Sequence, residues 1–160
     1  MSDAKPAAAS RIETAHLVMP PDANTYGSAF GGIVMSWIDI TASMSAMRHA
    51  RLPVVTAAVD QLNFVAPVRV GEMAVLVAQV NATFGSSMEV EVLVTSENPR
   101  TGERKRCCDA FVTFVALGQD LRPTRVPPLL CETDEERRRE AQARSRRQER
   151  LAQRQRDPLR

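Results

Sequence analysis

The sequence NTYGSAFGGIVMSWID occupies residues 24–39 and combines a turn-rich start, a glycine pair and an apolar helical pattern. The pair, Gly31 and Gly32, stands where a helix is expected to begin, and a helix start presents unpaired N–H groups and a partial positive charge. Asp39 follows about two turns later, at roughly 3.6 residues per turn, so it returns to the same helix face. The pattern predicts hydrogen-bond donors and a carboxylate on one side of a helix.

The elements around this stretch predict an α+β fold. Apolar residues recur at i, i+3, i+4 and i+7 over residues 32–49, as in a long and largely buried helix. The other segments are rich in β-branched residues, and the turns between them are too short for crossover helices. Neighbouring strands should mostly pair antiparallel, with the helix laid against a curved sheet. The expected strands cover residues 11–18, 54–65, 73–84, 88–95 and 106–117.

The length of 160 residues suits one globular domain with an appendage. We divide the chain into a flexible start at 1–10, a folded domain at 11–122, and a linker with an Arg-rich helix or tail at 123–160. The start lacks the apolar region of a signal peptide, and no apolar run approaches the ~20 residues that span a bilayer. We expect a cytoplasmic protein without a membrane span.

The net charge of +2 is uneven, because residues 132–160 hold ten arginines and seven acidic residues while the rest is nearly neutral. Thr133 and Glu136 fit a capping box at the start of this tail, which has almost no apolar stripe. We expect a solvated helix or a frayed tail. Nucleic-acid binding is the weaker alternative, because the tail has no aromatic residues for stacking.

Residues 73–84 are apolar on both faces of their expected strand. If one face holds the helix, the other face needs a partner, and a second copy of the chain is the simplest one. The sequence therefore predicts a homodimer or a larger homo-oligomer.

Several common active sites are absent from the sequence, including the Gly-x-Ser-x-Gly elbow, phosphate-binding loops and the usual zinc spacings. We interpret His16 as structural and His49 as a cation at the helix C-terminus. The three cysteines indicate reduced thiols rather than a disulfide framework. Asp39 is then the conspicuous group, since a carboxylate on an apolar helix costs free energy unless it is paired or lies in a wet cleft. With donors at the helix start, it could serve acyl hydrolysis.

Several stretches, in the right order, resemble the hotdog-fold acyl-CoA thioesterases, specifically the bacterial YciA-like group related to the duplicated brain acyl-CoA hydrolase. The resemblance covers roughly residues 11–118. The matching stretches are MPPDANTYGSAFGG at 19–32, WID at 37–39, VVTAAVD at 54–60, NFVAPVRVGE at 63–72 and DAFVTFVA at 109–116.

The resemblance implies a central helix wrapped by an antiparallel sheet, dimers whose sheets join edge to edge, and commonly a homohexamer built as a trimer of dimers. It places the sites at the dimer interface. Carried onto this chain, it implies that Asp39 is the catalytic base or nucleophile and that Gly31 and Gly32 polarise the thioester carbonyl. Asn24 matches a catalytic position, with a turn role as the alternative. Thr56 matches a substrate-binding position, with a plain strand residue as the alternative.

The family often carries Gly-Arg-Ser-Ser-Met after its third long strand, where the loop helps to hold coenzyme A. Here Ser86 and Ser87 follow Gly85 directly, so the loop is one residue shorter and lacks the arginine. We expect Ser86, Ser87 and Phe30 to contact the substrate. The candidates for the missing cation are Arg48, Arg69 and the arginines of the tail.

The leading hypothesis is hydrolysis of acyl-CoA to a free fatty acid and coenzyme A, within fatty acid metabolism and without a metal or organic cofactor. One alternative is a non-catalytic acyl-CoA-binding hotdog protein, because fold alone does not confer activity. Another is an interaction protein that acts through its basic tail, for which strongly salt-dependent binding would be the signature.

Overall fold

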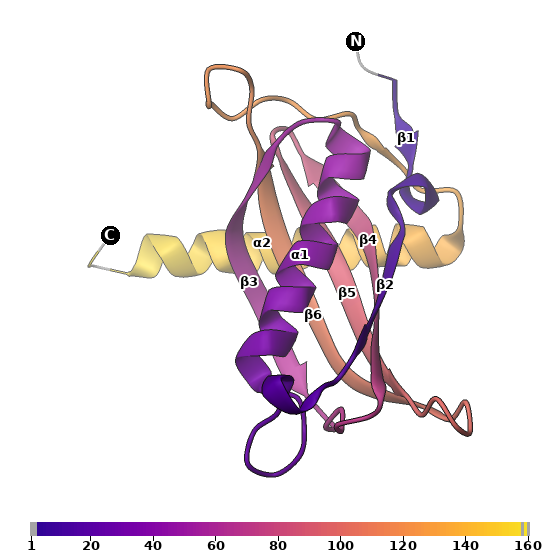
Figure 1. Cartoon of the computed structure of the whole chain (residues 1–160). Coiled ribbons are helices and arrows are strands. Elements are labelled where there is room, and N and C mark those ends of the chain that lie inside the picture. The colour runs from indigo at the N-terminus through magenta and orange to yellow at the C-terminus, as the bar shows by residue number, and fades with distance from the viewer. Residues whose placement is uncertain (1–2, 158, 160) are drawn as a thin grey trace.

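The structure, a computed structural model, describes residues 3–157 and 159 and has two long helices on opposite faces of an antiparallel sheet (Figure 1). This confirms the α+β arrangement, and the main strands and the first helix lie within a few residues of their predicted positions. The elements are β1 (Lys5–Pro6), a 3-10 turn (Ala7–Ser10), β2 (Ile12–Leu17), a 3-10 turn (Pro20–Asp22), α1 (Gly31–Ala50), β3 (Val54–Phe64), β4 (Met73–Phe84), β5 (Ser87–Glu97), β6 (Arg104–Ala116), β7 (Leu129–Leu130) and α2 (Asp134–Arg156).

Helix α1 builds the core by laying small and branched side chains against the sheet. Val34, Ile38, Ala42 and Ala46 recur every four residues and are at most 4% exposed. Because alanine has so short a side chain, the helix backbone can lie close to the sheet at Ala42 and Ala46. The helix ends at Arg51, whose left-handed backbone (φ 58°) lets its N–H donate to a carbonyl one turn back.

The main sheet has the strand order β2-β4-β5-β6-β3, and every pair in it is antiparallel. β3 pairs with β6 rather than with its chain neighbour β4, which leaves β2 and β3 as the two edges. The face toward α1 is apolar, with Leu76, Val92 and Phe114 at most 1% exposed. An edge strand presents unpaired backbone groups that another chain can use.

Helix α2 confirms the predicted charged C-terminal helix, most of whose residues are exposed, but one side of it is docked on the domain rather than free in solvent. It lies across the outer face of the sheet, on the side away from α1 (Figure 1). Its capping box is confirmed, since the Glu136 N–H donates to the Thr133 hydroxyl at 3.1 Å. The helix docks because Arg146 donates two hydrogen bonds, of 2.7 and 3.1 Å, to Glu89, which is only 1% exposed on β5. A carboxylate buried in this way needs such a partner.

The second apolar face of β4 is therefore not open to another copy, contrary to the sequence argument. Val75, on that outer face, is 4% exposed, and both α2 and the 3-10 turn Ala7–Ser10 pack against β4. Several exposed apolar side chains lie instead on α1 and β3, as described below.

The N-terminal residues from Lys5 onward pack against the domain instead of forming a flexible start, while residues 1 and 2 lie outside the described part. β1 pairs in parallel with β7. The Ser10 hydroxyl is buried and accepts a hydrogen bond of 2.9 Å from the Val80 N–H, beside a bulge in β4. A small polar segment is thus ordered by several long-range hydrogen bonds, which composition does not reveal.

His49 is not a cation at the helix end, because it is buried. The residue is 1% exposed, and its Nε2 lies 2.8 Å from the Pro127 carbonyl oxygen. Burial lowers the pKa of His49 below its ordinary value of 6.5, so the ring is neutral at pH 7. His16 stacks on Trp37 with ring centroids 4.6 Å apart, in keeping with a structural role.

Candidate active site

Asp39 lies midway along α1, on its exposed side, and faces β3. The Thr56 hydroxyl donates a hydrogen bond of 2.7 Å to Asp39 Oδ1. The second oxygen, Oδ2, has no partner among the described residues, so it can accept a proton or a hydrogen bond from a bound molecule. The structure thus brings two of the predicted site residues together and leaves one carboxylate oxygen available.

The helix start presents two backbone donors, as predicted. The Ile33 and Val34 N–H groups donate to the Phe30 carbonyl, whereas those of Gly31 and Gly32 have no acceptor within the described part of the chain. The Phe30 ring lies over Gly32, where a Cβ atom would be 2.6 Å from a ring carbon. Glycine at this position is required for the close approach of Phe30, which is itself 59% exposed.

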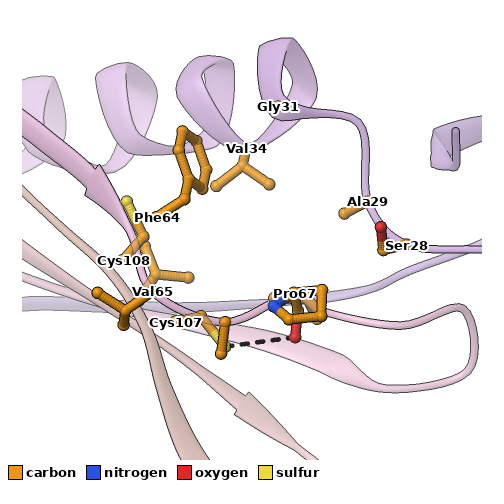
Figure 2. Close-up of a pocket in the computed structure, with 12 residues that line it drawn as sticks. Ser28, Ala29, Gly31, Val34, Phe64, Val65, Pro67, Cys107 and Cys108 are labelled. Atoms are coloured by element: carbon orange, nitrogen blue, oxygen red, sulfur yellow. Dashed lines mark hydrogen bonds between the residues drawn. The ribbon is translucent and has the colours of Figure 1, made fainter. Parts of the chain in front are cut away.

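A cavity of about 380 Å³ opens beside this helix start (Figure 2). Its walls are mainly apolar, and the side chains of Val34 and Phe64 lie together beneath the first turn of α1. Cys107 donates to the Pro67 carbonyl at 3.7 Å across the cavity floor. Burial raises the pKa of the Cys108 thiol to about 11, so this cysteine is a protonated wall residue rather than a nucleophile.

Within one chain, the glycine pair and Asp39 are too far apart to act on the same atom. At about 1.5 Å of rise per residue, seven or eight residues separate them by about 10 to 12 Å along the helix axis. A general base and oxyanion donors must each lie within about 3 Å of the groups they serve. The glycine pair and Asp39 share a helix face but lie at different positions along the helix axis.

Asn24 organises its own loop in the structure. Its Oδ1 accepts hydrogen bonds from the N–H groups of Tyr26, at 2.9 Å, and Ser28, at 3.3 Å. This is the turn role that the sequence left open, and it sets the path of the chain into α1.

The turn between β4 and β5, where Ser86 lies and after which Ser87 begins β5, is at the opposite end of α1 from the glycine pair. The Ser86 carbonyl accepts from the Ala116 N–H, next to the segment that follows the helix. The structure therefore does not bring Ser86 and Ser87 to Asp39 within one chain. Arginines of α2 do reach this turn, with the guanidinium carbons of Arg144 and Arg147 at 5.6 and 4.8 Å from the centre of the Phe84 ring.

Large apolar side chains surround Asp39 and remain exposed in the single chain. Met35 and Val59, which border a small cavity of about 30 Å³ together with Asp39, are 47% and 50% exposed. An exposed apolar surface beside an unpaired strand edge marks an interaction surface. Its members are Met35 and Ile40 on α1, Val59 and Phe64 on β3, and Val65 directly after β3.

Within the described residues, no His, Cys, Asp and Glu side chains gather in a group of three or more that could hold a metal ion. The expectation of a reaction without metal or organic cofactor stays a prediction. Neither long helix combines the length and apolar character needed to cross a membrane.

The model of the thioesterase superfamily matches residues 26–103, from the loop before α1 to the turn after β5. YkhA of Bacillus subtilis (strain 168), named an uncharacterized acyl-CoA thioester hydrolase, is 41% identical over 127 residues, which cover 79% of this chain and 74% of that relative. The chain belongs to the thioesterase superfamily. Longer mammalian members also match, and this chain spans between a fifth and about a third of their length.

Solved structures of the superfamily extend the match to nearly the whole chain. An apo-hexameric acyl-CoA thioesterase is 38% identical with a TM-score of 0.91, over 94% of this chain and 97% of that one. The acyl-CoA hydrolase of Staphylococcus aureus, solved with butyryl coenzyme A and coenzyme A, is 33% identical with a TM-score of 0.87, over 94% and 92%. Further structures of that enzyme carry single alanine substitutions at an aspartate, an asparagine or a threonine. These matches confirm the hotdog fold.

Sequence reasoning missed the cavity wall and the role of α2. Val94, Cys107 and Cys108 reach the cavity because β5 and β6 pass beneath the helix start. The alternation of apolar residues around Val94 is visible in the sequence, but no local pattern marks the packing gap that forms the cavity.

Proposed function

We propose that the protein hydrolyses acyl-CoA thioesters to a free acid and coenzyme A, with Asp39 as the base and the Gly31 and Gly32 amides as oxyanion donors. The observation that carries the proposal is a carboxylate oriented by Thr56 on the same helix that begins with two unpaired N–H groups. Membership of the superfamily supports it, because its relatives are named acyl-CoA thioester hydrolases.

The reaction follows from this arrangement. Asp39 Oδ2 accepts a proton from water as the water oxygen bonds to the thioester carbonyl carbon. The carbonyl oxygen becomes an oxyanion that the Gly31 and Gly32 N–H groups stabilise. The intermediate then collapses, the carbon–sulfur bond breaks, and the coenzyme A sulfur leaves with the electron pair and takes the proton held by Asp39, which returns to a carboxylate. The Thr56 hydrogen bond keeps the carboxylate in one orientation throughout.

The reacting centre forms from two copies of the chain, the glycine pair of one copy and Asp39 of the other. Pairing of two β3 edges about a two-fold axis would run the two α1 helices in opposite directions and bring the start of one toward the middle of the other. The exposed apolar side chains around Asp39 support this contact. The hexameric relatives support a trimer of such dimers.

The substituted residues of the S. aureus enzyme support the choice of residues. Its aspartate, asparagine and threonine are spaced along that chain as Asp39, Asn24 and Thr56 are here. Asn24 then contributes to the site by shaping the loop that enters α1, and it contacts the substrate across the dimer interface.

The two ends of the substrate bind to different surfaces of the protein. The apolar cavity beside Gly31 accepts the acyl chain, and the exposed Phe30 covers the thioester. Arg144 and Arg147, beside the turn at Ser86, supply the cation that the shortened loop lacks and face the phosphates of coenzyme A. We place the activity in the cytoplasm and in fatty acid metabolism. The cytoplasmic location is supported by a rat relative that is named a cytosolic acyl coenzyme A thioester hydrolase.

A thiol-release assay with short, medium and long acyl-CoA substrates tests the proposal. Wild-type protein should release thiol, and Asp39→Ala should lose most turnover with little change in oligomer or melting temperature. Asp39→Asn separates loss of charge from loss of shape. Retained activity in both variants would overturn the assignment, and tight acyl-CoA binding by wild-type protein without thiol release would favour the non-catalytic alternative.

The oxyanion donors have a test of their own. Gly31→Pro removes one N–H at the first helical position, where proline is tolerated, and should cost about 100- to 1000-fold in kcat. Gly31→Ala is the matched control, because it keeps the N–H and its Cβ would lie 4.0 Å from Phe64. Equal activity of the two variants would exclude Gly31 as a donor.

A further inference from the structure

Strand β3 contains a β-bulge. Residues before and after the bulge that would share a sheet face in a regular strand therefore point to opposite faces. Thr56 and Ala58 pair with consecutive residues of β6, so Ala57 is an extra residue without a cross-strand partner. In a regular strand, residues 56, 58 and 60 would share one face. Because of the bulge, Thr56 faces α1 and Asp39, while Asp60 faces α2 on the outer side of the sheet.

Asp60 is held on the outer face by the C-terminal half of α2. Arg150 Nη1 lies 2.5 Å from Asp60 Oδ2, and the two side chains are only 15% and 24% exposed. One turn earlier, the Arg146 guanidinium lies 3.7 Å from the ring centre of Phe111, the β6 residue paired with Asp60. Helix α2 thus contacts both β3 and β6 next to the bulge.

The bulge itself is not packed tightly against α2. An open groove of about 400 Å³ separates residues 57–59 from Arg150, Gln153 and Arg154 of the helix. A second irregularity follows at Gln61, whose backbone is left-handed (φ 51°). With space on one side and a kink on the other, the ion pair is a direct link between α2 and this part of β3.

We infer that Arg150 is a positioning residue for hydrolysis, because its ion pair with Asp60 holds β3 in the bulged register that points Thr56 at Asp39. A shift of one residue would turn Thr56 to the other face of the sheet. The carboxylate would then lose the hydrogen bond that orients it. This inference rests on the proposed function, because it gives Arg150, on the opposite side of the sheet, a role in orienting the catalytic carboxylate.

Arg150→Ala should lower kcat for acyl-CoA by about 10- to 100-fold and change KM little, because it misplaces a group that acts on the water rather than one that binds substrate. Arg138→Ala is the matched control on the same helix, since Arg138 is exposed and forms no ion pair within the described chain. The exchanged pair, Arg150→Asp with Asp60→Arg, should recover most of the lost kcat. Unchanged kcat in Arg150→Ala would overturn the inference.

Coupling to Thr56 distinguishes positioning from general destabilisation. Thr56→Val should lower kcat by itself, and adding Arg150→Ala to Thr56→Val should produce no further loss, because both act through one hydrogen bond. Losses that multiply would show that Arg150 does not act through Thr56. If Arg150→Ala fails to fold, Asp60→Asn removes the ion pair with almost no change in volume and replaces it in the same comparison.

The two proposals fail differently in these experiments. Wild-type protein that releases no thiol overturns the proposed function. Wild-type protein that is active, with Arg150→Ala and Asp60→Asn equally active, overturns the positioning role alone.

Discussion

The two long helices of the protein are similar in length and opposite in chemistry. Helix α1, with 20 residues, buries a seam of valine, isoleucine and alanine, whereas α2, with 23 residues, has Ala143 as its one buried residue in the described chain and docks through arginines. The first is held by burial of apolar surface and the second by specific ion pairs. Local periodicity locates the first helix, and the capping box locates the start of the second, but only knowledge of the partner strand shows where the second helix docks.

The largest expected effect breaks the docking of α2. Arg146→Ala leaves the Glu89 carboxylate buried without its charge partner, which should cost about 3–5 kcal/mol of unfolding free energy, as measured by urea denaturation. The double variant Glu89→Leu with Arg146→Met removes both charges and should regain most of this loss. A cost below about 1 kcal/mol for Arg146→Ala would mean that α2 is held as a surface helix.

The seam of α1 should respond to volume rather than to charge. Ala46 is fully buried, so Ala46→Leu should overpack the contact with the sheet and cost about 1–3 kcal/mol in the same denaturation experiment. An unchanged midpoint would show that the helix does not lie close to the sheet at this residue.

The stability of the protein should depend on pH through His49, near the C-terminal end of α1. Burial lowers the pKa of His49 in the folded state, so the unfolded chain binds this proton more readily. Stability should therefore fall as pH decreases through the ordinary value of 6.5, until the folded-state pKa is also passed. Urea midpoints measured from pH 7 downward should show this slope, and His49→Gln should flatten it. A slope of the opposite sign would mean that His49 is charged in the folded protein.

The smallest effect is expected on the solvent side of α2. Arg138→Ala should change stability by less than about 0.5 kcal/mol, because the side chain is exposed and unpaired within the described residues. A larger loss of stability would show that α2 also docks through the face that we assign to solvent.

The sequence predicts the inner half of the molecule well. The spacing of Val34, Ile38 and Ala42 identifies α1, and alternation identifies β5, because these features depend on neighbours in the chain. The separation of Asp39 from the glycine pair along the axis also follows from the helix rise alone.

The outer half was predicted poorly for a physical reason. Glu89 and Arg146 are far apart in the sequence, and nothing local to either residue marks them as partners. The same holds for the Ser10 hydroxyl and Val80, which order a segment that its composition marks as flexible. For the site, the resemblance implied a catalytic role for Asp39 and a substrate-binding role for Thr56, but their hydrogen bond and the bulge at Ala57 are visible only in the structure.

The most direct test of the account is thiol release by mixed oligomers of two inactive variants, Gly31→Pro and Asp39→Ala, produced together. If each site takes the glycine pair from one copy and Asp39 from the other, a mixed dimer contains one intact site. Random pairing then restores about a quarter of wild-type activity. No recovery above the two separate variants would contradict a site shared between copies.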